Sequence, residues 1–544
     1  MSSPPAVARS VAQDKVEVFG TQGAVASSSP LISLAGARVL AEGGNAIDAT
    51  LAMAAMGWMA LPGQCGIGGD VFVLVREPDG RVWTLNGSGL GPDGATTGFY
   101  RAAGHDAIPL SGALAVAVPG GLAALRALHG AGATRSLDEL WAPAVRLGSE
   151  GVPCTLKTRR DIAEHATDLA RDRGAAAMFL RGGGGLPEVG QRLVFKDLAD
   201  FVAAAAHDRE GFYDGSFADR AVSELASAGA PFSGREWAAG AEVAPADAIA
   251  RPYGSAMIHQ TPVPSAGWMV LQAAAICDGM LQGRELLDAE SVHWLAESFR
   301  LGFRDRHALC GSDNDGWERV LEAEVIGRAR DEISRFRASR SGPADPYGDT
   351  TSTVCVDADG RAVSLIQSLA FTFGARVTVP GTGVVLNNRL GRGAYLLEGH
   401  PNEVKPGRKP LHTLNAWAVD HPDTGLLHVG NCPGGDGQVQ WNMQVISHLL
   451  DHQVGPQTAV SLPRFTVFPG SDADVVDKPD ELRCESGLPE ETLAQLAAWG
   501  HPVRVVPTQV GGPGGSAMVI SVDHENGVLS AGADPRMEGV ALAI

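Results

Sequence analysis

The chain has 544 residues, of which 44% are hydrophobic, so it is long enough for two lobes or for one large layered domain with a sizeable core. Its 62 acidic and 43 basic side chains give a formal net charge of −19, which argues against nucleic acid and anionic membrane surfaces as partners. Anionic small molecules are not excluded, because a local pair of arginines can override the global sign.

The cysteines and the N-terminus indicate the compartment. Seven cysteines are scattered, odd in number and without CxxC spacing, a pattern that suits buried thiols in a reduced compartment. Residues 1–23 read as a short polar lead-in without the apolar segment of a signal peptide, and no apolar run reaches membrane-spanning length. We therefore expect a cytoplasmic protein.

The first half of the chain predicts helices and a few strands. Gly43 and Gly44 would end one helix, and Asn45 can cap the next. The glycine-rich run 66–69 precedes a strand instead of linking a strand to a helix, so it is no dinucleotide fingerprint and is expected to let two backbones approach closely. The predicted elements are a strand at 24–30, helices at 31–42 and 46–61, strands at 71–75 and 81–85, and a helical region at 137–230 with a loop at 182–185.

The second half adds hairpins and long apolar helices. Strands in hairpins, separated by buried helices, predict an α+β fold in which helices pack outside stacked antiparallel sheets. The predicted elements are a strand at 253–261, a helix at 266–280 capped by Ser265, a helix at 291–309, strands at 383–388, 415–419 and 426–429, a helix at 439–452, and a last strand at 528–533.

The stretch 349–368 is the most informative. β-branched residues dominate 349–357, Asp359-Gly360 supplies a tight turn, and alternation resumes at 362–368, which together predict a hairpin. A polar, breaker-rich segment at 339–348 precedes it and is expected to be a mobile loop. The junction fits an ordinary loop entering a hairpin, and it also fits a chain that cuts itself before Thr350 and uses the new terminal threonine as a nucleophile.

A pair of histidines could hold a metal. His448 and His452 lie four residues apart on a predicted helix, a spacing that can place two imidazoles on one ion. The sequence offers no third ligand beside them, and amphipathic surface helices carry such pairs by chance. We therefore expect no metal and no other cofactor, and we expect Cys432 to be a packing residue and not a redox group.

A succession of short motifs spans residues 24–540. In this order, the motifs resemble those of the gamma-glutamyltransferase (gamma-glutamyltranspeptidase) family of N-terminal-nucleophile hydrolases. The resemblance implies a four-layer αββα sandwich and a proenzyme cut between Asp349 and Thr350. The motifs are Gly43-Gly44-Asn45-Ala46-Ile47-Asp48-Ala49, Gly66-Ile67-Gly68-Gly69, Asp349-Thr350-Thr351, Asn387-Asn388, Lys409-Pro410-Leu411, Pro433-Gly434-Gly435 and the run 530–536.

The resemblance also implies subunits and catalytic residues. Residues 24–349 would form the large subunit and 350–544 the small one, intertwined in one domain, with a homo-oligomer of this heterodimer left open. The α-amine of a cleaved Thr350 would take the hydroxyl proton and so form an acyl-enzyme. Ser368 would orient Thr350, and the amides of Gly434 and Gly435 would form the oxyanion hole.

The residues that recognise glutamate depart from the family pattern. The region 86–92 lacks the expected arginine, and Ala370 stands where an asparagine is expected. Asn387-Asn388 is followed by Arg389 and Arg392 instead of an aspartate, and the paired serines after Pro-Leu are His412 and Thr413. These four residues, Arg389, Arg392, His412 and Thr413, are the candidate substrate-binding set.

Replacing an acid by arginines favours a carboxylate over an ammonium group. We therefore expect an amidohydrolase for a small acidic amide or acyl substrate, such as an oxamate-like compound or a natural-product intermediate. One of the arginines could instead pair with a structural acid. Other readings are a true gamma-glutamyl hydrolase or transferase, an enzyme that cleaves a C–C bond beside a carbonyl, and a binding protein that keeps the fold without catalysis.

Overall fold

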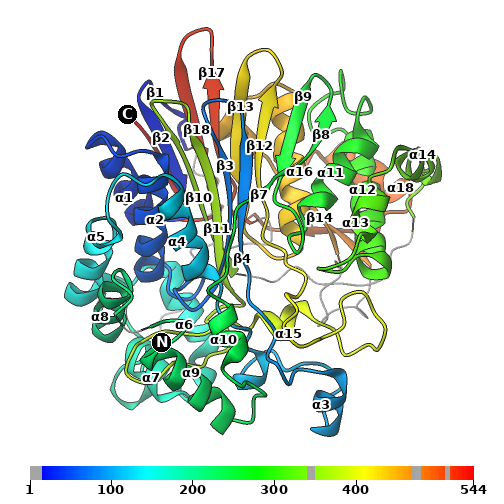
Figure 1. Cartoon of the computed structure of the whole chain (residues 1–544). Helices are drawn as coiled ribbons and strands as arrows, with labels where there is room; N and C mark the ends of the chain where they lie inside the picture. The colour runs from blue at the N-terminus through cyan, green and yellow to red at the C-terminus, as the bar shows by residue number, and fades with distance from the viewer. Residues whose placement is uncertain (1–14, 210, 340–348, 469, 471–479, 509–514) are drawn as a thin grey trace, which may run out of the picture.

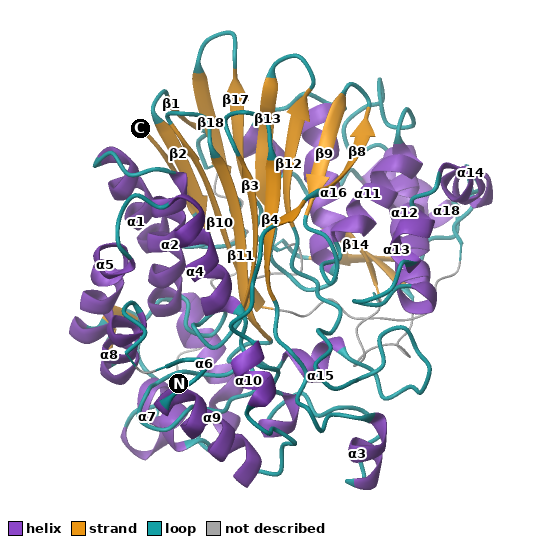
Figure 2. Cartoon of the chain, in the orientation of Figure 1, coloured by secondary structure: helices purple, strands orange, loops and turns teal. Residues whose placement is uncertain are grey.

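Two stacked antiparallel sheets form the centre of the molecule in the computed structural model, which describes residues 15–209, 211–339, 349–468, 470, 480–508 and 515–544. Helices cover the outer face of each sheet (Figure 1; Figure 2). This arrangement confirms the predicted α+β fold of stacked sheets between helices. The first sheet holds, in spatial order, β19 (Val540–Ala543), β2 (Gly23–Ser27), β10 (Asp349–Asp357), β11 (Ala362–Ala370), β3 (Asp70–Arg76), β4 (Val82–Gly87) and β7 (Ala246–Asp247).

The second sheet also has seven strands, and every neighbouring pair in both sheets is antiparallel. The predicted strand at 253–261 corresponds to β9, and a further strand, β8, precedes it because the chain reverses at Gly254, whose φ is +56°. In spatial order the sheet holds β1 (Val18–Gly20), β18 (Val528–Ala533), β17 (Met518–Asp523), β13 (Gly425–Asn431), β12 (Ala416–His421), β9 (Ala256–Gln260) and β8 (Ile249–Tyr253).

Some of the helices that cover the sheets are buried on almost every side. α2 (Ala46–Ala60) is buried along its whole length, and Asn45 caps it through the N–H of Asp48, as predicted. α16 (Gly437–Leu450) is buried as well. The other covering helices are α1 (Pro30–Ala41), α4 (Gly121–Gly132), α5 (Leu137–Glu150), α8 (Lys196–Ala205), α11 (Gly267–Cys277) and α12 (Ala289–Leu309).

Shorter elements surround this framework. All seven cysteines are buried free thiols, and none of the described helices is long and apolar enough to cross a membrane. The remaining helices are α3 (Thr97–Ala102), α6 (Leu156–Leu169), α7 (Arg173–Phe179), α9 (Ser216–Ser227), α10 (Arg235–Ala239), α13 (Gly316–Val320), α14 (Ala323–Glu332), α15 (Arg389–Gly393), α17 (Pro456–Ser461) and α18 (Glu490–Ala498), and the remaining strands are β5 (Val152–Pro153), β6 (Arg192–Leu193), β14 (Phe465–Phe468), β15 (Glu481–Glu485) and β16 (Val503–Val506).

The predicted strand at 383–388 is absent, and this prediction was wrong. The segment carries only an isolated bridge between Thr378 and Val385, and Gly383 has a φ of +66°. The backbone hydrogen bonds of the segment go largely to the nearby residues 375–379, as in the bond from Leu386 N–H to the Val377 carbonyl oxygen at 2.9 Å. The Asn387 side chain donates to the carbonyl oxygens of Gly68 and Ala117 at 3.2 and 3.0 Å, so the segment is satisfied outside both sheets.

The alternation of β10 and β11 places the predicted site between the sheets. Odd-numbered Cys355 and Val363 pack with the helices, whereas even-numbered Val354 and Val356 pack with the second sheet. The even-numbered Ser368, at the end of β11, therefore faces the space between the sheets.

Candidate active site

Thr350 and Ser368 meet at the open end of the β10–β11 hairpin. Asp349 pairs with Ala370 across the ladder, and the register shifts between Asp349 and Thr351. The Thr350 hydroxyl donates to Ser368 Oγ at 3.3 Å, and that oxygen also accepts the N–H of Ala370 at 2.9 Å. Thr350 is only 4% exposed. The loop predicted at 339–348 lies outside the described residues except for Ser339.

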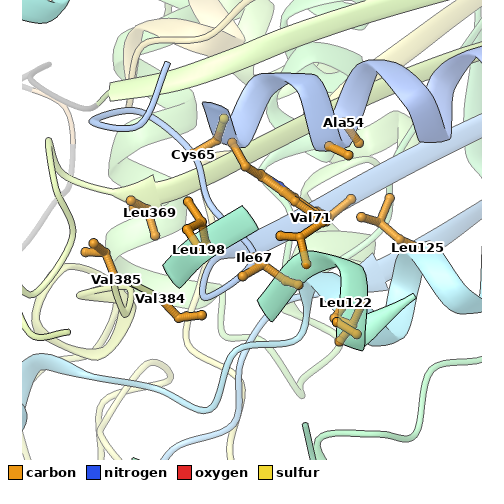
Figure 3. Close-up of a cluster of buried hydrophobic side chains, with 14 of the residues drawn as sticks. Ala54, Cys65, Ile67, Val71, Leu122, Leu125, Leu198, Leu369, Val384 and Val385 are labelled. Atoms are coloured by element: carbon orange, nitrogen blue, oxygen red, sulfur yellow. The ribbon is translucent and has the colours of Figure 1, made fainter. Parts of the chain in front are cut away.

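Behind this pair the strand end is fixed by an apolar cluster. Leu369 turns to the face opposite Ser368 and lies among Cys65, Ile67, Val384 and Val385 (Figure 3). Because these side chains are buried, they hold the end of β11 in place while the hydroxyl of Ser368 stays on the other face.

The glycine run lets backbones approach closely, as predicted. A Cβ atom on Gly68 would collide with the carbonyl oxygen of Val385, and one on Gly69 with that of Ser368. The close approach brings the next residue, Asp70, directly opposite Ser368 in the β11–β3 ladder. Directly paired residues share one face of a sheet, so the Asp70 carboxylate lies beside the Ser368 hydroxyl.

Asp70 binds two of the predicted substrate residues. Its Oδ2 accepts Nε of Arg389 at 2.7 Å and Nε2 of His412 at 3.0 Å, and all three side chains are buried. Burial alone would raise the pKa of Asp70, but Arg389 and His412 bring it below its usual value. The reading in which one arginine pairs with a structural acid therefore holds for Arg389.

His412 is a neutral imidazole in this arrangement. Its Nδ1 accepts the N–H of Leu414 at 3.1 Å, so the proton must sit on Nε2, which donates to Asp70. Burial, followed by the Arg389 charge, lowers the pKa of His412 to about 3. His412 thus offers a donor to Asp70 and no positive charge at neutral pH.

Arg392 contacts the end of β11. It is 2% exposed, its Nη1 donates to the Ala370 carbonyl oxygen at 3.4 Å, and its guanidinium lies 4.5 Å from the centre of the Phe371 ring. Ala370, whose carbonyl it contacts, has a φ of +84°, a conformation that costs a non-glycine residue roughly 1–2 kcal/mol. The backbone at Ala370, beside Thr350, is therefore held by its surroundings in a conformation that a flexible chain would not keep.

The asparagine pair holds this turn in place. Asn388 accepts the N–H of Phe371 at 2.9 Å through Oδ1 and donates to the Leu110 carbonyl oxygen at 2.7 Å through Nδ2. Asn387 Oδ1 accepts the Arg389 N–H at 3.0 Å. The short helix α15, which carries both arginines, is thus fixed against the end of β11.

Gly434 and Gly435 form the turn between β13 and α16. Their φ values are +129° and +57°, and Gly434 packs against Trp441, so both positions favour glycine. Their carbonyl oxygens accept from the first turn of α16, whereas neither amide N–H has an acceptor among the described residues. A buried ion pair between Arg306 and Asp436, at 2.5 Å, holds the turn. The turn therefore holds two backbone donors that have no acceptor among the described residues.

The last predicted residue of the substrate set is Thr413. It is 4% exposed, and its carbonyl oxygen accepts Nδ2 of Asn415 at 3.0 Å. It follows His412 directly, so its backbone lies in the same segment between the two sheets.

Asp70 is the residue that sequence reasoning missed, although it directly follows the glycine-rich run 66–69. An acid as the first residue of an otherwise apolar strand, directly after close-packed glycines, is the signal that could have identified it. Its partner Arg389 lies 319 residues away in sequence, so no local pattern connects the two.

The predicted metal pair is not joined by a third ligand within the described residues. His448 is buried, and its ring centre lies 6.1 Å from that of His452. Another group, His293, Glu297 and His501, has ligand atoms within 4.8 Å of one another. The guanidinium of Arg300 already contacts Glu297 and His501 there, so the arginine supplies the positive charge that a metal ion would bring.

Cys432 is a buried thiol beside the turn formed by Gly434 and Gly435, and burial raises its pKa to about 12.

Comparisons with known proteins cover nearly the whole chain. Residues 32–544 match the family model described as gamma-glutamyltranspeptidase. The chain is 33% identical to the glutathione hydrolase-like YwrD proenzyme of Bacillus subtilis, over 97% of this chain and 99% of that protein. It is 30% identical to the oxamate amidohydrolase proenzyme of Klebsiella pneumoniae, over 96% and 98%. The structure of cephalosporin acylase from Bacillus halodurans superposes with a TM-score of 0.89 at 29% identity, covering 100% of this chain and 99% of that one. The chain belongs to the gamma-glutamyltranspeptidase family.

Proposed function

We propose that this protein is a self-processing amidohydrolase whose nucleophile is Thr350, released as an N-terminus by cleavage after Asp349. The observation that carries the proposal is the hydrogen bond between Thr350 and Ser368 at the start of β10. Cleavage there would give a 349-residue and a 195-residue subunit. The relatives named as proenzymes support a precursor that is cut.

The chemistry follows from the groups at the sheet end. The free α-amine of Thr350, with an ordinary pKa of about 7.7–8.0, is partly unprotonated at neutral pH and takes the proton of its own hydroxyl. The hydroxyl oxygen attacks the amide carbonyl while Ser368 holds its orientation. The amides of Gly434 and Gly435 would stabilise the oxyanion, a contribution of roughly 3–4 kcal/mol per donor. The amine leaves, and water hydrolyses the acyl-enzyme.

The charge of the site supports an acidic substrate. Arg389 is paired with Asp70, and Nη1 of Arg392 donates to the Ala370 carbonyl oxygen at the end of β11 at 3.4 Å. A guanidinium group at this place favours a substrate carboxylate over an ammonium group. One relative is named for oxamate, which carries a carboxylate next to its amide. We infer that gamma-glutamyl compounds, whose ammonium group would face these cations, are poor substrates.

Processing and activity can be tested together. On a denaturing gel the wild type should give two bands, and N-terminal sequencing of the smaller one should begin at Thr350. Thr350→Ala should stay intact and inactive, whereas Thr350→Ser should still be cut. Thr351→Ser, one residue along and bonded to Gln64, serves as the matched control and should behave as wild type. Turnover by the Thr350→Ala variant would overturn the assignment.

Substrate class needs a separate measurement. Oxalyl, succinyl and gamma-glutamyl anilides should be compared under one set of conditions. The oxalyl and succinyl anilides should give a higher kcat/KM than the gamma-glutamyl anilide. Equal or better turnover of the gamma-glutamyl anilide would instead favour the glutamyl reading. An intact chain without turnover of any of them would favour a binding protein.

A further inference from the structure

The loop at the end of β11 keeps backbone conformations that non-glycine residues seldom adopt. Among the described residues, six that are not glycine have a positive φ, and three of them, Ala370, Phe373 and Arg376, lie within residues 370–376. Strain of this kind persists only where the surroundings enforce it, and it is concentrated at functional sites. The strained loop begins two residues after Ser368, so its side chains are candidates for contacts beside the nucleophile.

Phe371 is the aromatic residue of this loop that the core does not use. It is half-buried and belongs to none of the hydrophobic clusters formed by the described residues. By contrast, Phe373 is fully buried, and its ring centre lies 4.7 Å from that of Phe179. The ring centre of Phe371 lies instead 4.5 Å from the guanidinium carbon of Arg392, a cation–π contact. This contact, and not core packing, therefore accounts for the position of Phe371.

Asn388 holds both members of this pair. Its Oδ1 accepts the Phe371 N–H at 2.9 Å, and its backbone carbonyl oxygen accepts the Arg392 N–H at 3.3 Å. The Phe371 carbonyl oxygen in turn accepts the Gly374 N–H at 2.8 Å. The backbone of Phe371 is thus bonded on both sides, and its side chain has only χ1 and χ2 left to turn. The ring and the guanidinium are therefore preorganised against each other.

A short series of contacts joins this pair to the nucleophile. The Thr350 hydroxyl donates to Ser368 Oγ at 3.3 Å, and the same oxygen accepts the Ala370 N–H at 2.9 Å. The carbonyl oxygen of Ala370 accepts Nη1 of Arg392 at 3.4 Å. Across the ladder Ala370 is paired with Asp349, whose carbonyl group self-cleavage would attack. Paired residues have Cα atoms about 4.5–5.5 Å apart, so Arg392 contacts the residue directly opposite the bond that Thr350 would cut.

Stacking on a ring gives the guanidinium a fixed direction. The group holds five N–H donors in one plane, and the bond to Ala370 uses one of them. A ring against the face of that plane prevents the group from tilting, and a carboxylate can then accept two parallel N–H bonds at its edge. Without the ring, the long arginine side chain would lose this orientation and would bind a carboxylate less tightly.

We propose that Phe371 is a specificity-determining residue, which orients the Arg392 guanidinium to bind a substrate carboxylate next to the scissile carbonyl. Because it acts through Arg392, it is a positioning residue and not a catalytic one. The proposal rests on the amidohydrolase function proposed above and adds the residue that selects acids among the substrates. Thr350 and Arg392 are both buried in the uncut chain, so the tests use the processed protein.

Two anilides that differ at the charged group test the assignment. Oxalyl anilide has a carboxylate next to the scissile carbonyl, and pyruvoyl anilide has a methyl ketone in its place. Phe371→Leu removes the ring but stays apolar, and it should raise KM for oxalyl anilide about three- to thirtyfold, the range expected for the loss of one cation–π contact. KM for pyruvoyl anilide should stay within about twofold, and Phe371→Tyr should keep both values near those of the wild type.

A second ring beside a guanidinium provides the matched control. The ring centre of Phe336 lies 5.1 Å from the guanidinium carbon of Arg335, and this side chain is 55% exposed and packs on Trp499. Phe336→Leu removes the same kind of contact away from the end of β11. It should change KM for neither anilide.

A double-mutant comparison shows whether the ring works through the arginine. In an Arg392→Met background, Phe371→Leu should raise KM for oxalyl anilide no further. A further rise of the same size would mean that the ring acts independently of Arg392, and the assignment would be wrong. Equal losses on both anilides in the single variant, or a lower melting temperature without discrimination between them, would make the ring structural and would also overturn it.

One further measurement separates the two proposals. If the wild type cleaves neither anilide, the amidohydrolase proposal fails. Calorimetric titration with oxalate then still decides the role of the ring, since the wild type should bind oxalate at least about threefold more tightly than Phe371→Leu. Equal binding, or binding by neither protein, would overturn the assignment.

Discussion

At the scale of single residues, the charge of the site is set by one acid that the sequence did not single out. The Asp70 carboxylate neutralises the charge of Arg389 and accepts a hydrogen bond from the neutral imidazole of His412. The reversal of charge expected from two added arginines is therefore partial, because the charge of Arg389 is compensated by Asp70. Sequence alone places these groups in a family pattern but cannot say which of them pair, because the pairs join segments about 300 residues apart.

The neutral state of His412 leads to a prediction about stability. His412→Gln keeps an N–H that can donate to Asp70, so it should lower the free energy of unfolding by less than about 1 kcal/mol at pH 7. His412→Leu removes that donor from a buried carboxylate and should cost about 2–3 kcal/mol. Chemical denaturation of the two variants measures the difference. Similar losses in both would show that the donor is unimportant.

At the scale of elements, local sequence patterns predicted the hairpin that carries the candidate site, whereas tertiary contacts determined the structure around it. The β10–β11 hairpin was predictable because an Asp-Gly turn joins two β-branched runs, and α2 because Asn45 caps an apolar stretch. The segment 383–388 has the composition of a strand, yet its hydrogen bonds go partly to the nearby residues 375–379 and partly to loops from distant parts of the chain. A local sequence pattern does not show which groups elsewhere in the fold will take a segment's hydrogen bonds.

The turn of the hairpin also anchors a helix. Asp357 accepts the N–H of Ala46, at the start of α2, at 2.8 Å, and the N–H of Arg361 at 2.9 Å. We expect Asp357→Ala to lower the free energy of unfolding by about 2–3 kcal/mol, because it leaves buried N–H groups without an acceptor. Asp359→Ala, two residues along and exposed, is the control and should stay within about 0.5 kcal/mol. Thermal and urea unfolding measure both, and equal effects would contradict the anchoring role.

At the scale of the whole molecule, buried histidines make stability depend on pH. Burial lowers the pKa of His448 and His501 to about 3 and that of His428 to about 4, in addition to His412. The unfolded chain binds protons at these residues below about pH 6.5, whereas the folded chain does not. Folding stability should therefore fall as pH drops from 6.5 towards 4, by up to about 1.4 kcal/mol per pH unit for each histidine.

His448 allows a direct test of this slope. Neither of its ring nitrogens has a hydrogen-bond partner among the described residues, so His448→Met removes a titrating group without breaking a bond. The variant should match or exceed wild-type stability at pH 7 and lose less stability between pH 6.5 and 5. His452→Met, on the half-exposed neighbour, is the control. Melting temperatures measured across that range give the slopes, and parallel curves for wild type and His448→Met would refute the explanation.

The order of the strands determines what cleavage before Thr350 would do to the assembly. β2 precedes the cut, yet it is paired on one side with β10 and on the other with β19, both of which follow it. In the second sheet, β1 and β9 likewise border strands from the other side of the cut. The two products could separate only by breaking ladders in both sheets at once. Dilution should therefore not release them, and a nicked molecule should sediment as one particle until it unfolds.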